Sequence, residues 1–183
     1  EFRRVLFRSY EGPPLDDGFR KLLRNNLTIG FNSRNYDIPI LVAAAGGLTN
    51  AELKVLSDQI IVEGKAGWQL GYSIPPKWDH IDIIELAIGQ SSLKIYGGRL
   101  GAPKMQDLPI DPDADISPEQ REVLREYCVN DLHTTALLYT TLKPQIDLRI
   151  SMSEQYGVDL RSKSDAQIAE AILRAEYEAN TGK

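Results

Sequence analysis

The segment from residue 118 to residue 142 constrains the fold more than any other part of the chain. Ser117, Pro118 and Gln120 form a typical helix start, with a capping box and a proline at the first helical position. The residues that follow at three- and four-residue steps share one helical face and must face a core. This face comprises Val123, Leu124, Tyr127, Cys128, Thr135, Leu138 and Leu142. We predict a helix over 118–142 that ends at Lys143-Pro144, because proline cannot donate the next helical hydrogen bond.

One carboxylate interrupts this face. Tyr127 and Asp131 are four residues apart and therefore project from the same side of the helix. A carboxylate that faces a core needs a partner to offset its loss of hydration. A metal ion would be such a partner, but a nearby arginine or a helix terminus would serve as well. From the Tyr127–Asp131 pair alone, an arginine or a helix terminus is a more economical partner for Asp131 than a metal ion.

A second stretch lies about ninety residues earlier, from Leu27 to Leu41. A short β-prone run breaks at Asn32-Ser33 and leads into an apolar helix that ends at Gly46-Gly47. Asp37 lies at the start of that helix, where the helix dipole favours an acidic residue. Helix capping accounts for Asp37, but it does not account for Asn32 lying four residues before Tyr36.

Together, the two stretches resemble the DEDD superfamily of 3′–5′ exonucleases, in the subgroup whose third motif carries tyrosine. The second family motif matches Asn32, Tyr36 and Asp37, and the third motif, Tyr-x-x-x-Asp, matches Tyr127 and Asp131. The Tyr-Cys-x-x-Asp form is similar to the proofreading domains of family B and phage-type DNA polymerases. The resemblance covers residues 27–142, most of the chain.

The resemblance implies an α/β fold, the ribonuclease H-like three-layer exonuclease fold, truncated at its N-terminus. The sheet would be small, because the first strands of that fold are missing from the sequence. The elements expected from the residues are strands near 27–31 and 79–85 and helices near 36–46, 50–64 and 118–142.

The resemblance also implies a mechanism, in which two divalent ions, Mg²⁺ or Mn²⁺, support hydrolysis at the 3′ end of single-stranded DNA. Asp131 would bind the ion that carries the attacking water, and Asp37 would hold the other ion through waters. Tyr127 would orient the nucleophile through its hydroxyl group. Asn32 and Tyr36 would contact the terminal nucleotide. Asp37, Tyr127 and Asp131 are thus the predicted catalytic residues.

The first motif of the family, Asp-x-Glu on a strand, occurs nowhere in the 183 residues. Residues 1–9 fit nothing that follows, and we interpret them as a non-native scar. We therefore expect residues 10–143 to be an incomplete exonuclease-like domain with little or no activity. Residues 144–183 would be a linker and the start of a helical region on the side of a polymerase module in the same full-length chain.

Composition limits the alternatives. The chain is 42% apolar, so it can bury a core, and its single cysteine, Cys128, excludes a disulfide framework and is expected to be a packed thiol. No apolar run reaches eighteen residues, so no membrane partner is expected, and the cytoplasm of a bacterial or phage-infected cell is the predicted location. The net charge is −5; without three Arg and one Glu of residues 1–9 it becomes 18 − 25 = −7, which argues against a broadly basic surface.

Several local features complete the prediction. Residues 17–25 form a basic amphipathic helix, and Thr49 and Ser164 each open a helix with a capping box. Asp82 is expected either to support the site or to bond neighbouring backbone, and His80 is expected to be partly exposed at a strand end. Other functions remain open: a free-standing RNA exonuclease, a catalytically inactive nucleic-acid-binding module, and an unrelated α/β domain.

Overall fold

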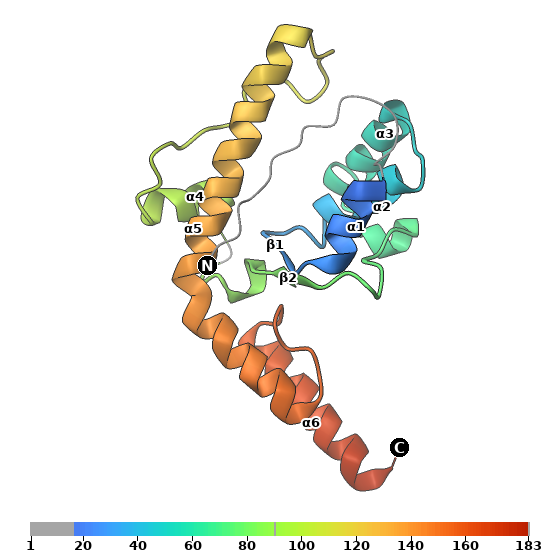
Figure 1. Cartoon of the computed structure of the whole chain (residues 1–183), viewed down its shortest axis with the longest axis vertical. Helices are drawn as coiled ribbons and strands as arrows, with labels where there is room; N and C mark the ends of the chain where they lie inside the picture. Colours follow the sequence, from blue (N-terminus) through green and yellow to red (C-terminus); the bar gives the residue numbers. More distant parts are fainter. Residues whose placement is uncertain (1–16, 90, 183) are drawn as a thin grey trace. The chain divides into compact units, whose positions relative to one another are not determined.

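The computed structural model describes residues 17–89 and 91–182, and the chain divides into two compact units. Among the described residues, unit 1 takes in 87–89 and 91–144, and unit 2 takes in 17–86 together with 145–182. The proposed scar at residues 1–9 lies outside the described residues. Figure 1 labels the helices and strands that are named below.

Unit 2 begins with three helices and contains both strands of the described chain. The helices are α1 (Asp17–Asn25), α2 (Asp37–Ala45) and α3 (Asn50–Ile61), and the strands are β1 (Thr28–Gly30) and β2 (His80–Asp82). The predicted capping box at Thr49 is confirmed, because Thr49 Oγ1 accepts from Glu52 N and the Glu52 carboxylate accepts from Thr49 N. The predicted basic helix over 17–25 is also confirmed.

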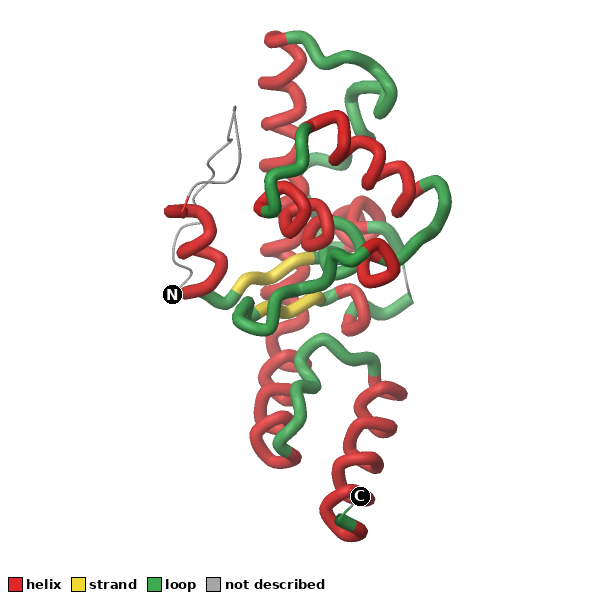
Figure 2. The backbone as a smooth tube through the Cα atoms, turned by 90° about the vertical axis from the view of Figure 1, so that its right-hand side faces the viewer, coloured by secondary structure: helices red, strands yellow, loops and turns green. Residues whose placement is uncertain are grey.

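The two strands are parallel and lie side by side (Figure 2), with Thr28 opposite His80 and Gly30 opposite Asp82. The ladder extends at both ends, since Thr28 N donates to Asp79 O at 2.9 Å and Ile83 N donates to Gly30 O at 2.9 Å. Ile81 and Ile83 are completely buried. Because parallel strands end at the same edge of a sheet, the residues after Gly30 and Asp82 lie close together.

The expected ribonuclease H-like α/β fold is wrong: the described chain is mostly helical, and its sheet has two parallel strands. The β-branched run after His80 does not stay extended. Asp82 Oδ1 accepts from Ile84 N at 3.1 Å, and Ile84–Leu86 turn into a short 3₁₀ helix, η2. A side-chain acceptor therefore replaces the sheet ladder as the partner of this backbone, and the strand ends after three residues.

Unit 1 consists of α4 (Leu93–Arg99) packed on the first part of α5 (Pro118–Tyr156). Ser92 caps α4, and Ser117 and Gln120 form the predicted cap of α5, with Ser117 N donating to Gln120 Oε1 at 2.8 Å. Gly97 lies against α5, because an added Cβ atom would lie 2.9 Å from Thr134 Cγ2. A side chain at this position would force Thr134 to move.

The predicted end of this helix at Lys143-Pro144 is wrong, because α5 continues through Pro144 to Tyr156. Proline removes one hydrogen bond from a helix, but burial of the next turns compensates for that loss. Ile146 is 1% exposed and Arg149 is 6% exposed, so the continuation is held by packing in unit 2. Pro144 is also the boundary between the two units.

The last helix, α6 (Asp165–Thr181), starts at the predicted Ser164 capping box. Arg149 of α5 joins it, since Arg149 Nη2 donates to Asp165 Oδ1 at 2.6 Å and Arg149 Nε donates to Lys163 O at 3.1 Å. Ile168 and Leu160 are also buried. In the described part of the chain, no helix is long and apolar enough to cross a membrane.

Candidate functional site

Asp82 organises the loop that carries the predicted second motif. It is 2% exposed, and its carboxylate accepts from three backbone amides: Asn32 N at 2.9 Å, Arg34 N at 2.9 Å and Ile84 N at 3.1 Å. Ser33 Oγ also donates to Asp82 Oδ2 at 3.3 Å. A buried carboxylate is stable only when such donors replace its hydration. Of the two roles expected for Asp82, bonding to neighbouring backbone is confirmed.

His80 lies beside Asp82 on the same face of β2 and is 5% exposed, so the expectation of a partly exposed His80 is wrong. Its Nε2 lies 2.8 Å from Ser33 Oγ, and its Nδ1 lies 2.8 Å from Thr28 Oγ1. Burial lowers the pKa of His80 below its ordinary value of 6.5, although the neighbouring Asp82 opposes that shift. The imidazole is therefore neutral at pH 7, and it links the start of β1 to the loop after β1.

The loop after β1 needs an unusual backbone conformation at Asn32. Its φ angle is +55°, and it is the one residue besides glycine with a positive φ among those described. Asparagine tolerates this left-handed region better than most residues. Its Oδ1 accepts from Asn35 Nδ2 at 2.7 Å. The asparagine of the second motif thus has a structural reason for its identity.

The other two residues of this motif mark the start of α2. Tyr36 is the N-cap residue, and its hydroxyl lies 3.0 Å from Ser57 Oγ on α3, which fixes the start of α2 against α3. Asp37 is the first residue of α2 and is exposed. The structure therefore brings Asn32, Tyr36 and Asp37 together in one turn at the carboxyl end of β1.

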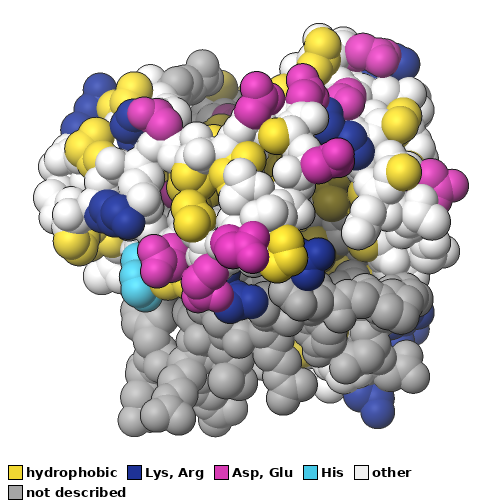
Figure 3. Space-filling view, turned by 90° about the horizontal axis from the view of Figure 1, so that it is seen from above, with side chains coloured by type: hydrophobic (Ala, Val, Ile, Leu, Met, Phe, Trp, Pro, Cys, Tyr) yellow, Lys and Arg dark blue, Asp and Glu magenta, His cyan; other side chains and the backbone are white. Residues whose placement is uncertain are grey.

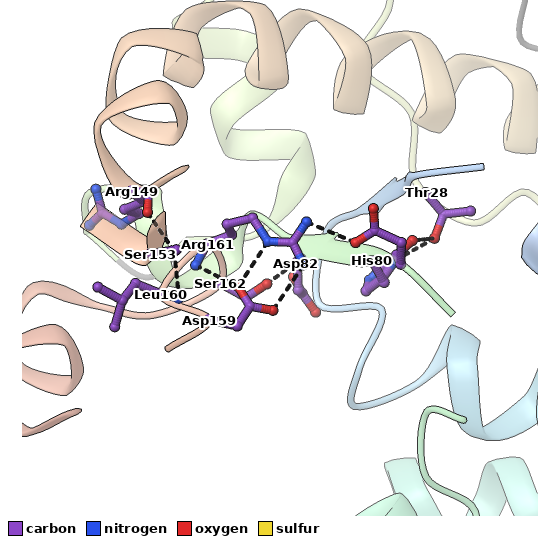
Figure 4. Close-up of polar contacts among 10 residues, drawn as sticks. Thr28, His80, Asp82, Arg149, Ser153, Asp159, Leu160, Arg161 and Ser162 are labelled. Carbon is purple, nitrogen blue, oxygen red and sulfur yellow. Dashed lines mark hydrogen bonds and ion pairs between the residues drawn. The ribbon is translucent and has the colours of Figure 1, made fainter. Parts of the chain in front are cut away.

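A second segment of unit 2, residues 159–162, contacts β2 near Asp82 (Figure 4). Ser162 Oγ accepts from Asp82 N at 3.0 Å. Arg161 lies between two carboxylates, with Nη1 donating to Asp79 Oδ1 at 2.8 Å and Nε donating to Asp159 Oδ1 at 2.8 Å. The Arg161 guanidinium lowers the pKa of the Asp159 carboxyl. These contacts hold the segment after α5 against β2.

A cleft of about 670 Å³ lies next to this junction, between the loop after β1, the end of β2, the segment 158–163 and α6. Its charged lining is mixed in sign, with the basic residues Arg34, Lys163 and Arg174 and the acidic residues Asp82, Glu85, Asp159, Glu170 and Glu178. Clefts at the carboxyl end of parallel strands are common binding sites. Arg34 and Asn35 of the motif loop are part of its wall.

The predicted third motif lies in unit 1. Tyr127 and Asp131 are both half-buried and lie one turn apart on the same side of α5. Burial raises the pKa of the Asp131 carboxyl, and the Tyr127 hydrogen bond acts in the opposite direction. Burial and the adjacent carboxylate raise the pKa of Tyr127, so its hydroxyl keeps its proton at neutral pH. Tyr127 is therefore available as a hydrogen-bond donor and not as a base.

Cys128, the residue between these two, was expected to be packed but is exposed. The apolar face of α5 is buried only from Leu138 onward, whereas Val123 is 47% exposed and Leu132 is 39% exposed. The first turns of α5 thus carry the Tyr127–Asp131 pair at a surface and not in a core.

The described residues do not complete a metal site. Asp37 and Asp131 offer the oxygen ligands that Mg²⁺ and Mn²⁺ prefer, but each motif supplies a single carboxylate, and the two belong to different units. No group of three or more His, Cys, Asp and Glu side chains that could hold a metal is present among residues 17–89 and 91–182. Two ions would need further carboxylates from outside this set.

Sequence reasoning missed the group formed by Thr28, Ser33, His80 and Asp82. A signal for it was available, since residues 80 and 82 alternate along a strand and must project from one face. A histidine and an aspartate on the same face of an apolar strand require polar partners, and the nearest polar residues follow β1.

Comparison of the chain with protein-family models, with curated proteins and with solved structures gives no match.

Proposed function

We propose that the chain is part of a 3′–5′ exonuclease of the proofreading type, within a longer DNA polymerase chain. Asp37, Tyr127 and Asp131 are the proposed catalytic residues, and Asn32 and Tyr36 are the proposed contacts to the terminal nucleotide. Such a function belongs to the cytoplasm of a bacterial or phage-infected cell. Its substrate is the 3′ end of a single DNA strand.

The observation that carries the proposal is the Tyr127–Asp131 pair. Burial raises the pKa of this carboxyl, so keeping it ionised at neutral pH costs stability. Groups whose pKa is shifted by burial and a specific partner are concentrated at functional sites. A protonated tyrosine beside an aspartate can orient a water or a phosphate oxygen by donating a hydrogen bond.

The loop after β1 supports the same proposal in a second way. Its backbone amides at Asn32 and Arg34 donate to the buried Asp82 carboxylate, which holds this part of the loop in place. Binding sites gain affinity when the protein does not have to be ordered on binding. A turn held in this way, with Asp37 exposed at its end, suits recognition of a strand end.

The proposal is tested with a version of the chain extended upstream of Tyr10 through a strand bearing Asp-x-Glu. With Mg²⁺ present, this protein is expected to release mononucleotides from the 3′ end of single-stranded DNA. Asp131→Asn should lower the rate roughly 100-fold or more, a typical cost of removing a group that stabilises developing charge. Glu126→Gln, an exposed neighbour on the same helix, is the matched control and should leave the rate unchanged. Equal rates for Asp131→Asn and the control would refute the proposal.

One specific observation favours a second function, a nucleic-acid-binding module without catalysis. The described residues assemble no group of three metal-ligating side chains, and binding to a strand end does not require one. Under this alternative, the extended protein binds single strands but releases no nucleotides with either Mg²⁺ or Mn²⁺. The same assay, run with DNA and RNA of one sequence, also distinguishes a DNA exonuclease from an RNA exonuclease.

A further inference from the structure

A second cleft of unit 2, at the carboxyl-terminal end of α2, has an unusual charge pattern. It has a volume of about 500 Å³, and α1, the end of α2 and the Pro75–Trp78 turn form its walls. Among the described residues, its charged lining consists of Arg20, Arg24 and Lys77, with no acidic side chain. The chain as a whole has a net charge of −5, so a cleft whose described charged residues are three cations departs from the average surface.

The cleft beside α6 and the face shown in Figure 3 do not share this pattern. The cleft beside α6 has three basic and four exposed acidic residues in its wall. On the face seen in Figure 3, Lys and Arg side chains are interspersed with Asp and Glu, and neither sign forms a uniform field. A chain of phosphates is attracted to a run of cations and repelled by mixed acidic neighbours. Of these two clefts, the one between α1, the end of α2 and the Pro75–Trp78 turn is the one that suits a polyanion.

Arg20 has a structural part in this cleft. Its Nη2 donates to Ala45 O at 2.6 Å, at the last turn of α2, where unpaired carbonyl groups attract cations. This hydrogen bond holds α1 against the end of α2. Arg24 lies four residues further on the same side of α1, so the Arg20 contact also directs Arg24 toward the cleft.

Lys77 and Trp78 are placed by a tight turn on the opposite wall. Trp78 N donates to Pro75 O at 2.9 Å, and Pro76 has the fixed φ angle that the second position of such a turn prefers. Lys77 and Arg24 are exposed, and neither has an ion pair in the part of the chain that the structure describes. Trp78 is half-buried and contributes an aromatic surface to the same wall.

We propose that the cleft between α1, α2 and the Pro75–Trp78 turn binds single-stranded nucleic acid. Arg24 and Lys77 contact successive phosphates, and Trp78 contacts a base. Cations that follow a backbone, combined with an aromatic side chain on which bases stack, are the usual means of binding single strands without sequence preference. The cleft contains none of the proposed catalytic residues, so it can bind a strand whether or not the chain hydrolyses one.

The first test measures the affinity of the complete 183-residue chain for a fluorescent oligothymidylate. An oligomer of about 12 nucleotides is within the range of single-strand site sizes. Binding to single strands weakens as salt rises, and each phosphate contact contributes about 0.7 to the slope of log affinity against log salt concentration, called the salt slope here. Two contacts therefore contribute roughly 60-fold in affinity at about 50 mM salt. Arg24→Ala with Lys77→Ala should therefore weaken binding roughly 60-fold and reduce the salt slope by about 1.4.

The matched control is Lys21→Ala with Lys104→Ala, which removes the same charge from exposed positions outside the cleft. It should leave both the affinity and the salt slope close to those of the wild-type chain. Circular dichroism at the start of the experiment verifies that both double variants are folded. The proposal is overturned if the two double variants bind equally well, or if the wild-type chain does not bind the oligomer at about 100 µM, a typical upper limit for non-specific binding.

The second test reports on the base contact. The chain has two tryptophans, and Trp68 is 71% exposed, so Trp68→Phe leaves Trp78 as the single tryptophan fluorophore. Oligothymidylate should quench this fluorescence, whereas inorganic polyphosphate should bind without quenching. Polyglutamate and vesicles of anionic lipid serve as competitors of the oligomer. If either one displaces it as effectively as unlabelled oligothymidylate does, the cleft recognises anions in general and the nucleic-acid assignment is wrong.

Discussion

Asp82→Asn is the substitution that tests the organisation of the motif loop most sharply. In the wild-type chain, Asp82 Oδ1 accepts from the Asn32 and Ile84 amides, and Oδ2 accepts from the Arg34 amide and the Ser33 hydroxyl. An asparagine can present one oxygen to only one of these pairs. Its NH₂ group must then face a backbone N–H on the other side.

The cost follows from that geometry. One buried amide loses its acceptor, which costs about 1–3 kcal/mol. The Ser33 hydroxyl can rotate and accept from the new NH₂ group, which recovers part of the loss. We therefore expect Asp82→Asn to lower the free energy of unfolding by about 2 kcal/mol. Asp82→Ala removes every acceptor and should cost about 3–5 kcal/mol, in the range of mutations that disrupt a buried polar network.

Urea unfolding followed by circular dichroism measures these changes, and amide hydrogen exchange shows where they arise. The exchange of the Asn32 and Arg34 amides should accelerate in Asp82→Asn. Asp79→Asn is the matched control, because Asp79 lies three residues earlier, is 50% exposed and pairs with Arg161. An exposed ion pair of this kind contributes less than about 1 kcal/mol. Equal stability of Asp82→Asn and wild type, with unchanged exchange at Asn32 and Arg34, would refute the reasoning.

Three further predictions concern other parts of the chain. The pKa of His80 is lowered in the folded state, so its contribution to stability is complete above about pH 6.5 and is lost as pH falls below that value. The urea midpoint should therefore differ less between low and neutral pH in His80→Gln than in wild type. The pKa of Asp131 is raised, so its ionised form opposes folding at neutral pH. Asp131→Asn should therefore raise the thermal midpoint at neutral pH. A lower midpoint would contradict a destabilising Asp131 carboxylate. Pro144→Ala restores a backbone donor to Thr140 O inside α5, and should increase the free energy of unfolding by about 1–3 kcal/mol in urea titrations.

The sequence predicted the features that depend on near neighbours. The capping boxes at Thr49, Ser117 and Ser164 each need two side chains three residues apart, and all three helices begin where this chemistry places them. The placement of Tyr127 and Asp131 on one side of α5 likewise depends on a four-residue separation along one helix. Such pairs are encoded locally, and they form whatever the rest of the chain does.

The features that were wrong depend on distant residues. The run after His80 has the composition of a strand, but Asp82 binds the amide of Ile84 and ends the pairing. Pro144 has the chemistry of a helix end, but burial of Ile146 and Arg149 in the following turns outweighs one missing hydrogen bond. The assignment of a three-layer fold relied on a family resemblance in two short motifs. Two motifs cannot supply the strands of such a sheet.

The central claim is that the turn from Asn32 to Asp37 binds the 3′ end of a single DNA strand. Photo-crosslinking tests this claim on the chain as it is, with an oligothymidylate whose 3′-terminal base is 4-thiothymine. Peptide mapping should place the crosslink within the segment that contains Asn32 and Tyr36, and an oligomer with the photoreactive base at its 5′ end should not label that segment. Labelling of the same peptides from both ends, or of peptides outside this turn alone, would contradict the account.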